Sequence, residues 1–155
     1  ECAGICTKCN IGKDKKTLCN LNENIKCKNL SYMNNQIFTI ITNNNNNIWF
    51  ETIDNNSTIY SSQNNTNNEH KWKFIKVNGH DCIFYITSDN NPKYFLQTDK
   101  SGNLKASLFK GGISQFWQII PVNKSGIVMF LIKSVYNCLY MNESLIKYIT
   151  IFNII

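Results

Sequence analysis

Two stretches of this chain, "HKWKFIKVN" (residues 70–78) and "QFWQIIPVN" (residues 115–123), share a Trp at the third place and a Val-Asn ending. The match extends toward the N-terminus, because "QIFTIITN" (36–43) precedes the first and "CIFYITSD" (82–89) precedes the second. A third copy of this preceding segment is "VMFLIKSV" (128–135). The Phe residues of the three copies lie 46 residues apart both times. This regular spacing predicts a chain built from three repeats.

Each repeat divides into four short apolar segments, which are rich in β-branched and aromatic residues and nearly all bounded by turn residues. The second, third and fourth segments are 47–53, 57–62 and 70–77, then 93–99, 104–109 and 115–122, then 137–143, 144–149 and 150–155. No stretch of ten or more residues has a helical period. The sequence therefore predicts an all-β domain of about 12 short strands, in repeats of about 34–78, 79–123 and 124–155.

Repeat 2 resembles known families. "GISQFWQI" (112–119) is similar to the Q-x-W segment of ricin-type lectin repeats, with Gln115 and Trp117 at the motif places. Residues 84–107 are similar to a fascin-type repeat. Over residues 34–155 the chain thus resembles the β-trefoil superfamily, which implies a barrel of six strands capped at one end by three hairpins.

The other repeats depart from this motif. His70 stands where the motif has Gln, Phe152 replaces the Trp, and repeat 3 is shorter by about ten residues before its last segment. The equivalent large side chains are expected to form the core, since burying each stabilises the fold by a few kcal/mol. These core residues are Phe38, Trp72, Phe74, Phe84, Trp117, Ile119, Phe130 and Phe152.

Residues 1–33 form a cysteine-rich N-terminal extension that is poor in large apolar side chains. Such a segment cannot order itself by burial alone, so we expect disulfides to hold it, as in small secreted modules. The disulfide candidates are Cys2, Cys6, Cys9, Cys19, Cys27, Cys82 and Cys138. Because seven is odd, one thiol is free, bridges to another chain or has lost its partner.

The "CTKC" stretch (6–9) has the spacing of a metal or redox site. A zinc ribbon needs a second C-x-x-C or a pair of His, and neither lies near it. A redox motif would begin a helix in a βαβ unit, which the repeats do not contain. We therefore expect no metal and no other cofactor. The predicted partner of Cys82 is Cys138 or a Cys of the extension.

The charge pattern limits the partners. The chain of 155 residues carries a net charge of +6, which favours acidic partners. All 16 basic residues are Lys and they are scattered, whereas nucleic-acid binding generally uses clustered Lys and Arg with stacking aromatics. We expect no nucleic-acid partner. No run of about 18 apolar residues exists, so we expect no direct membrane insertion either.

Several features favour a secreted, extracellular or cell-surface glycoprotein. The cysteine content is one, and the N-glycosylation sequons are another. The sequons begin at Asn29, Asn55, Asn56, Asn64, Asn123 and Asn142. No signal peptide is visible and the chain begins without Met, which we interpret as a mature or trimmed product.

Catalytic groups are few. The only His residues are His70 and His80, and His80 precedes Asp81 and Cys82. Adjacent residues of an extended segment point to opposite faces, so a Cys/His nucleophile is not favoured here. We expect the protein not to be an enzyme.

Binding is the expected activity. In ricin-type repeats an Asp after the second strand's Cys-Leu holds sugar hydroxyls, but Leu96 is followed by Gln97 and Leu139 is followed by Tyr140. The family's sugar site is therefore not carried over. An altered polar and stacking pocket from Tyr94 and Gln97, with Gln115 of the motif, is the candidate ligand site.

Three functions fit this reading. The favoured one is a non-catalytic secreted or cell-surface adhesion module that binds a protein partner, as part of a larger surface assembly, because an odd cysteine could link it to another chain. The first alternative is a lectin-like domain with an altered site for carbohydrate, including anionic glycans attracted by the positive charge. The second alternative is a protease inhibitor or cytokine-like ligand that uses one exposed loop.

Overall fold

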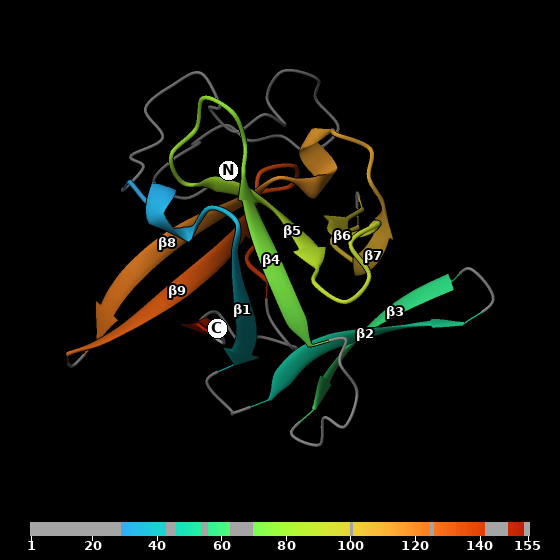
Figure 1. Ribbon diagram of the computed structural model, residues 1–155, viewed down its shortest axis with the longest axis horizontal. Coiled ribbons are helices and arrows are strands. Elements are labelled where there is room, and N and C mark those ends of the chain that lie inside the picture. The colour runs from blue at the N-terminus through green and yellow to red at the C-terminus, as the bar shows by residue number, and fades with distance from the viewer. Residues whose placement is uncertain are drawn as a thin grey trace.

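The computed structural model describes residues 29–42, 46–53, 56–62, 70–99, 101–124, 126–141 and 149–153 (Figure 1). Five of the predicted disulfide cysteines, Cys2, Cys6, Cys9, Cys19 and Cys27, lie outside these residues, so the stapled extension stays a prediction.

The described residues form ten strands and two short 3-10 helices. Within this part of the chain no helix is long and apolar enough to cross a membrane. In chain order the elements are η2 (Ser31–Met33), β1 (Gln36–Thr42), β2 (Asn47–Ile53), β3 (Asn56–Ser62), β4 (Lys71–Lys76), β5 (Ile83–Ser88), β6 (Tyr94–Thr98), β7 (Leu104–Leu108), η3 (Ile113–Gln115), β8 (Trp117–Lys124), β9 (Ile127–Ser134) and β10 (Ile149–Asn153).

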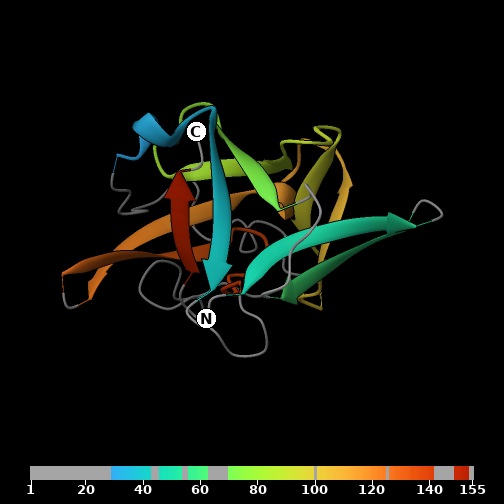
Figure 2. The same cartoon turned by 60° about the horizontal axis from the view of Figure 1, so that its bottom comes forward.

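Six strands close into a barrel, each antiparallel to its neighbours. β1 pairs with β4, β4 with β5, β5 with β8, β8 with β9, β9 with β10, and β10 with β1. Figure 2 shows the closing pair, β1 and β10, side by side. Each predicted repeat contributes its first and fourth segments to this circuit, as the β-trefoil resemblance implied. The predicted all-β trefoil architecture is confirmed.

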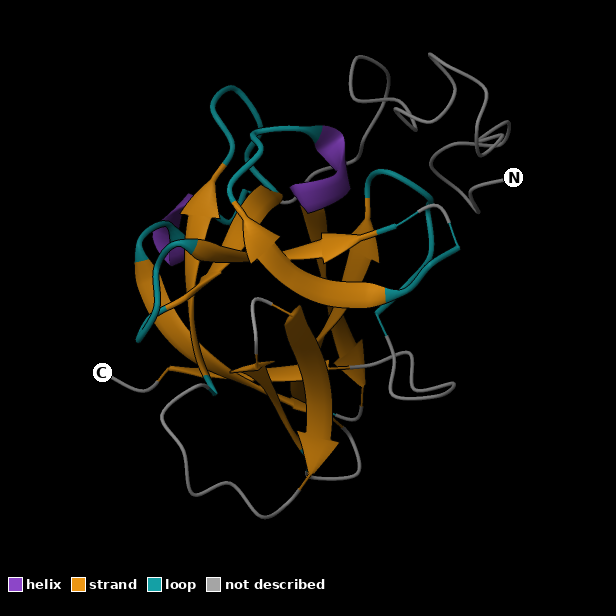
Figure 3. Cartoon of the chain, turned by 90° about the vertical axis from the view of Figure 1, so that its right-hand side faces the viewer, coloured by secondary structure: helices purple, strands orange, loops and turns teal. Residues whose placement is uncertain are grey.

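The second and third segments of repeats 1 and 2 form hairpins outside the barrel. They are β2–β3 and β6–β7, and β3 and β7 end the path of paired strands (Figures 1 and 3). In repeat 3, Tyr140 makes an isolated bridge to Lys133, and the following residues 142–148 lie outside the described part. Two of the three predicted hairpins are therefore seen.

Most strand bounds differ from the predicted segments by one or two residues, and two of these differences involve residues of the Q-x-W motif. Gln115 was expected at the start of a strand, but it ends η3, and β8 begins at Trp117. His70 likewise precedes β4. The reason for the first difference is that the Gln115 side chain bonds the main chain of a preceding loop, which turns its own backbone out of the extended path.

The two Trp residues fasten the hairpins to the barrel. Trp72 is fully buried and its indole N–H donates to the carbonyl of Ile48 in β2, at 2.9 Å. Trp117 is 2 % exposed and donates in the same way to Leu96 in β6, at 3.0 Å. Burial of each indole stabilises the fold by about 2–3 kcal/mol, and each hydrogen bond adds about 1 kcal/mol. The repeated Trp is thus a structural residue.

The remaining predicted core residues follow this pattern in part. Phe38, Phe74 and Phe84 are buried. The ring centroid of Phe74 lies 5.2 Å from that of Phe38 and 5.9 Å from that of Phe84. Ile119 is also buried. Phe130 is only partly buried, on the outside of this cluster. The Phe152 side chain lies outside what the structure describes.

The last residues of the predicted extension pack on the trefoil. Leu30 and Met33 are 2 % and 1 % exposed and belong to the hydrophobic core. The Leu30 N–H also donates to the carbonyl of Asp81, at 3.1 Å. The domain division after residue 33 stays a prediction, but core residues already begin before it.

Cys82 and Cys138 are the two disulfide candidates that lie within the described residues. Cys82 is buried just before β5, while Cys138 has φ +62° in the turn after β9. Their pairing is not defined within the described residues, so the predicted connectivity stays a prediction.

Candidate recognition pocket

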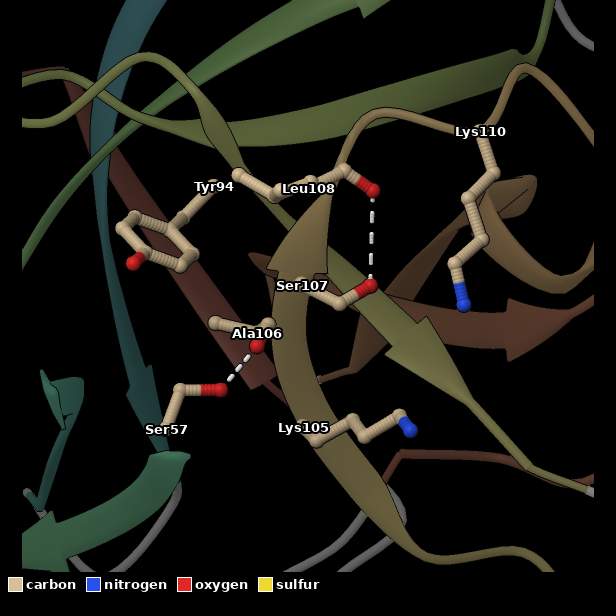
Figure 4. Close-up of a pocket in the computed structure, with 7 residues that line it drawn as sticks. All are labelled: Ser57, Tyr94, Lys105, Ala106, Ser107, Leu108 and Lys110. Atoms are coloured by element: carbon tan, nitrogen blue, oxygen red, sulfur yellow. Dashed lines mark hydrogen bonds between the residues drawn. The ribbon is translucent and has the colours of Figure 1, made fainter. Parts of the chain in front are cut away.

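A pocket of about 430 Å³ lies where the two described hairpins meet (Figure 4). The edge strands β3 and β7 come together there, and the Ser57 hydroxyl donates to the carbonyl of Ala106. This volume falls within the range of small-ligand sites in proteins. The lining residues are Ser57, Tyr94, Lys105, Ala106, Ser107, Leu108 and Lys110.

One side of the pocket is aromatic and aliphatic. Tyr94 begins β6 opposite Leu108 of β7, and its half-buried ring packs against Phe50 with centroids 5.6 Å apart. The Lys93 ammonium lies 5.5 Å from the centre of the same ring. Leu108 is 57 % exposed. This wall offers to a ligand an exposed alkyl group and the part of the Tyr94 ring that Lys93 and Phe50 leave open.

The other lining groups are hydroxyls and cations. In Figure 4 the Lys105 and Lys110 side chains lie on one side of β7, and Ser57 and Tyr94 lie on the other. Both lysines are exposed. The Ser107 hydroxyl donates to the Gln97 side-chain oxygen at 2.5 Å and accepts a long bond from Gln115 Nε2 at 3.4 Å, which leaves one acceptor lone pair on its oxygen.

The structure separates the three predicted site residues. Tyr94 lines the pocket, while Gln97 and Gln115 are buried and bonded to each other, with 3.3 Å between Gln115 Nε2 and Gln97 Oε1. Tyr94 and Gln97 are three residues apart on one strand, so their side chains leave opposite faces. A direct ligand contact by either Gln stays a prediction, and both already serve internal hydrogen bonds.

Gln115 positions the loop that carries Lys110. Its Nε2 donates to the Leu108 carbonyl at 2.9 Å, and its Oε1 accepts the Lys110 N–H at 2.8 Å. Gly111 follows with φ +68°, where an added Cβ would meet the Phe109 ring at 3.3 Å. The loop from Leu108 to Gln115 is therefore held at both ends.

Aromatic rings pack against Phe109 of this loop. Tyr85 makes edge contacts with Phe95, Phe109 and Phe116, with centroids 6.0, 5.2 and 5.2 Å away. Burial raises the pKa of the Tyr85 phenol above its ordinary value. Phe109 also packs on Phe95, at 5.0 Å, yet remains 55 % exposed.

A second ordered loop precedes β7. The Asp99 carboxylate accepts hydrogen bonds from the N–H groups of Asn103 and Ser101, both at 2.9 Å, and from the Asn103 amide at 3.1 Å. The Asn103 backbone bond is the largest cause that lowers the pKa of Asp99, and the charge of Lys105 adds a smaller effect. Asp99 thus organises its own loop.

The residues weighed for catalysis have other contacts. Asp81 pairs with Lys76 at 4.0 Å, and Cys82 is 1 % exposed within the hydrophobic core. Among the described residues, no group of three or more His, Cys, Asp or Glu side chains could hold a metal ion.

Ser57, Lys105 and Lys110 were not identified from the sequence. They come from two different repeats, and no motif marks the contact between the third strand of repeat 1 and the third strand of repeat 2.

Comparison with known proteins supports the fold. No protein-family model matches the chain, and no curated protein matches it. Among solved structures, the BEL β-trefoil is similar with a TM-score of 0.63 and 11 % identity, over 78 % of this chain and 94 % of that one. A mosquitocidal holotoxin is similar with a TM-score of 0.62 and 13 % identity, over 77 % of this chain but only 17 % of the toxin.

A lectin is a further match. The Polyporus squamosus lectin, in a structure bound to Neu5Acα2-6Galβ1-4GlcNAc, has a TM-score of 0.54 and 15 % identity, over 79 % of this chain and 45 % of the lectin. At these identities the likeness shows the β-trefoil fold alone. Proteins with this fold thus include lectins and toxins.

Proposed function

We propose that this β-trefoil domain is a non-catalytic recognition module that binds a saccharide in the pocket between its two hairpins. The observation that carries the proposal is the Tyr94 ring, which packs against Phe50 on the same side of β7 as the Ser57 hydroxyl, in a pocket that Ser107 also lines. Sugars present apolar C–H faces as well as hydroxyls, so a fixed ring next to polar groups offers contacts to both.

The fold supports the same proposal. A rigid barrel that carries variable hairpins is a suitable scaffold for recognition, because the site can vary without cost to the core. The Polyporus squamosus lectin shows that a protein with a similar fold can bind a saccharide. The sequence does not carry over the Asp of the ricin-type sugar site, so the pocket is proposed from its own geometry.

The test is saccharide binding by the whole chain, measured by glycan array and then by calorimetry on the hits. Tyr94→Leu removes the ring face, and we expect the dissociation constant to rise about 2- to 12-fold. Tyr32→Leu is the matched control, because Tyr32 is 70 % exposed in η2 and does not line the pocket. Equal affinity of the two variants, or a blank array, would overturn the proposal.

A protein partner is the second candidate. Leu108 and Phe109 are adjacent, 57 % and 55 % exposed, and presented on the loop that Gln115 holds. Exposed apolar pairs on rigid loops are common in protein interfaces. Pull-down with the wild type and with the Phe109→Ser variant checks this candidate. It requires that the wild type capture a specific protein, that the variant fail to capture it, and that neither bind a saccharide.

We also propose an extracellular or cell-surface location, which the cysteine content supports. Mass spectrometry of the native secreted material, with and without reduction, would test it. Reduced cysteines throughout and unmodified sequons in cytosolic fractions would contradict it. Inhibitor or cytokine-like activity stays a further alternative, checked by titration against a protease panel.

A further inference from the structure

Two lysines line the pocket, and the other lining residues that the structure describes carry no charge. Lys105 and Lys110 are both exposed and lie on the same side of β7 (Figure 4). We propose that the saccharide held here is acidic, and that Lys105 and Lys110 bind its sulfate or carboxylate group. This inference rests on the proposed saccharide function and adds the chemistry of the ligand and the residues that select it.

Neither lysine is neutralised within the described part of the chain. The only ion pair found there joins Lys76 to Asp81. The charge of Lys105 lowers the pKa of Asp99 slightly, but no ion pair joins these two described residues and Asp99 does not line the pocket. An acidic group entering the pocket therefore meets two ammonium groups and, among the described lining residues, no carboxylate, which favours its binding.

The backbone under both lysines is fixed. Lys105 lies opposite Gln97 in the fully paired β6–β7 hairpin. The N–H of Lys110 donates to the buried side chain of Gln115. A ligand thus orders only the flexible lysine side chains and leaves the main chain as it is, which limits the entropy cost of binding.

The arrangement also orients the ligand. The ring of Tyr94 and the two lysines lie on opposite sides of β7, so a ligand that uses both must cross the strand (Figure 4). We expect the uncharged part of the saccharide to lie against Tyr94 and its acidic group to lie toward the lysines. A chain of at least two sugars suits this span better than one sugar does, and the pocket of about 430 Å³ has room for a small ligand.

The experiment compares matched acidic and neutral saccharides by calorimetry on the whole chain. The probes are a heparin-derived oligosaccharide and its desulfated form, and a sialylated trisaccharide and its asialo form. Each lysine contact is worth about 5-fold, so we expect at least one acidic member to bind roughly 10- to 30-fold more tightly than its neutral match. The advantage should shrink between about 50 and about 300 mM salt, because the lysines are exposed.

Charge-matched variants separate a site from general attraction. Lys105→Gln with Lys110→Gln should lower the affinity for the acidic member to that of the neutral one. The control is Lys71→Gln with Lys73→Gln, which removes the same charge from β4, away from the pocket lining. An equal loss in the control pair would show unspecific attraction and would overturn the inference.

The other outcomes are equally decisive. Neutral members that bind as tightly as acidic ones, with Tyr94→Leu still weakening them, would overturn the inference and leave the saccharide function standing. No binding by any saccharide would overturn both. Selective binding of only the sulfated or only the sialylated probe would support the inference and name the source of the acid. Binding to phosphatidylserine vesicles without any preference for acidic over neutral saccharides would assign the lysines to a lipid surface and overturn it.

Discussion

Replacing Gln115 with Met removes the buried amide that holds the Leu108–Gln115 loop while keeping most of the side-chain volume. In the folded protein this amide donates to the Leu108 carbonyl at 2.9 Å and accepts the Lys110 N–H at 2.8 Å. It also donates to Gln97 at 3.3 Å. The variant therefore tests whether one side chain controls both local stability and the placement of a pocket lysine.

The expected cost follows from these bonds. Each of the two short bonds to the main chain is worth about 1 kcal/mol. Leu108 and Lys110 are exposed, so water can satisfy part of what is lost, whereas Gln97 is 6 % exposed and cannot gain a water so easily. We expect a loss of about 2–3 kcal/mol in the free energy of unfolding. For a chain of this size that corresponds to a fall in Tm of about 5–10 °C.

The assay is urea unfolding together with amide hydrogen exchange at Lys110. Gln36→Met is the matched control, because Gln36 is half-buried and has a single long bond to the Asn34 carbonyl, at 3.5 Å. The control should lose less than about 0.5 kcal/mol. If Gln115→Met unfolds at the same urea concentration as wild type and the Lys110 amide stays protected, the reasoning about this loop is wrong.

Three further predictions follow from the packing and the loops. Trp72→Phe and Trp117→Phe should each destabilise the fold by about 2–4 kcal/mol in urea unfolding, because each loses the same type of buried hydrogen bond to a hairpin carbonyl and some packing; effects that differ by more than about 2 kcal/mol would contradict their structural equivalence. Gly111→Ala should cost more stability than Gly79→Ala, since both have positive φ but only the first would meet a ring, at 3.3 Å; thermal unfolding checks the order. Because the folded pKa of Asp99 is lowered, the contribution of Asp99 to stability is present above its unfolded pKa and is lost as pH falls below about 4. Asp99→Asn should therefore flatten the acid limb of a curve of unfolding free energy against pH, and an unchanged limb would contradict the assignment.

The threefold repeat was readable from the sequence because it leaves a periodic mark. Phe38 and Phe84 recur at a fixed spacing, and Trp72 and Trp117 recur in the same way, since equivalent core positions need side chains of similar size. Strand bounds followed closely where apolar residues alternate, as in β4. Gln115 was misplaced in a strand because its bonds to a loop carbonyl and a loop N–H are set by tertiary contact.

The candidate site was only partly accessible to sequence reasoning. Tyr94 was identified from its place in the second strand of repeat 2, and it does line the pocket. Ser57 could not be found, because nothing in its local sequence records that β3 will meet β7. Gln97 has a polar side chain that suggests a ligand contact. The pleat of β6 turns this side chain away from Tyr94, and it is buried against Gln115.

The sequence by itself determined the all-β class, the threefold repeat and most of the core. The reason is that hydrophobic periodicity and turn chemistry are local properties, and they recur in each repeat. The tertiary structure alone decided which edge strands meet, which lysines share one side of β7, and which glutamine amides serve internal bonds. These outcomes depend on contacts between residues far apart in the chain, such as Ser57 and Ala106, and such contacts leave no local pattern.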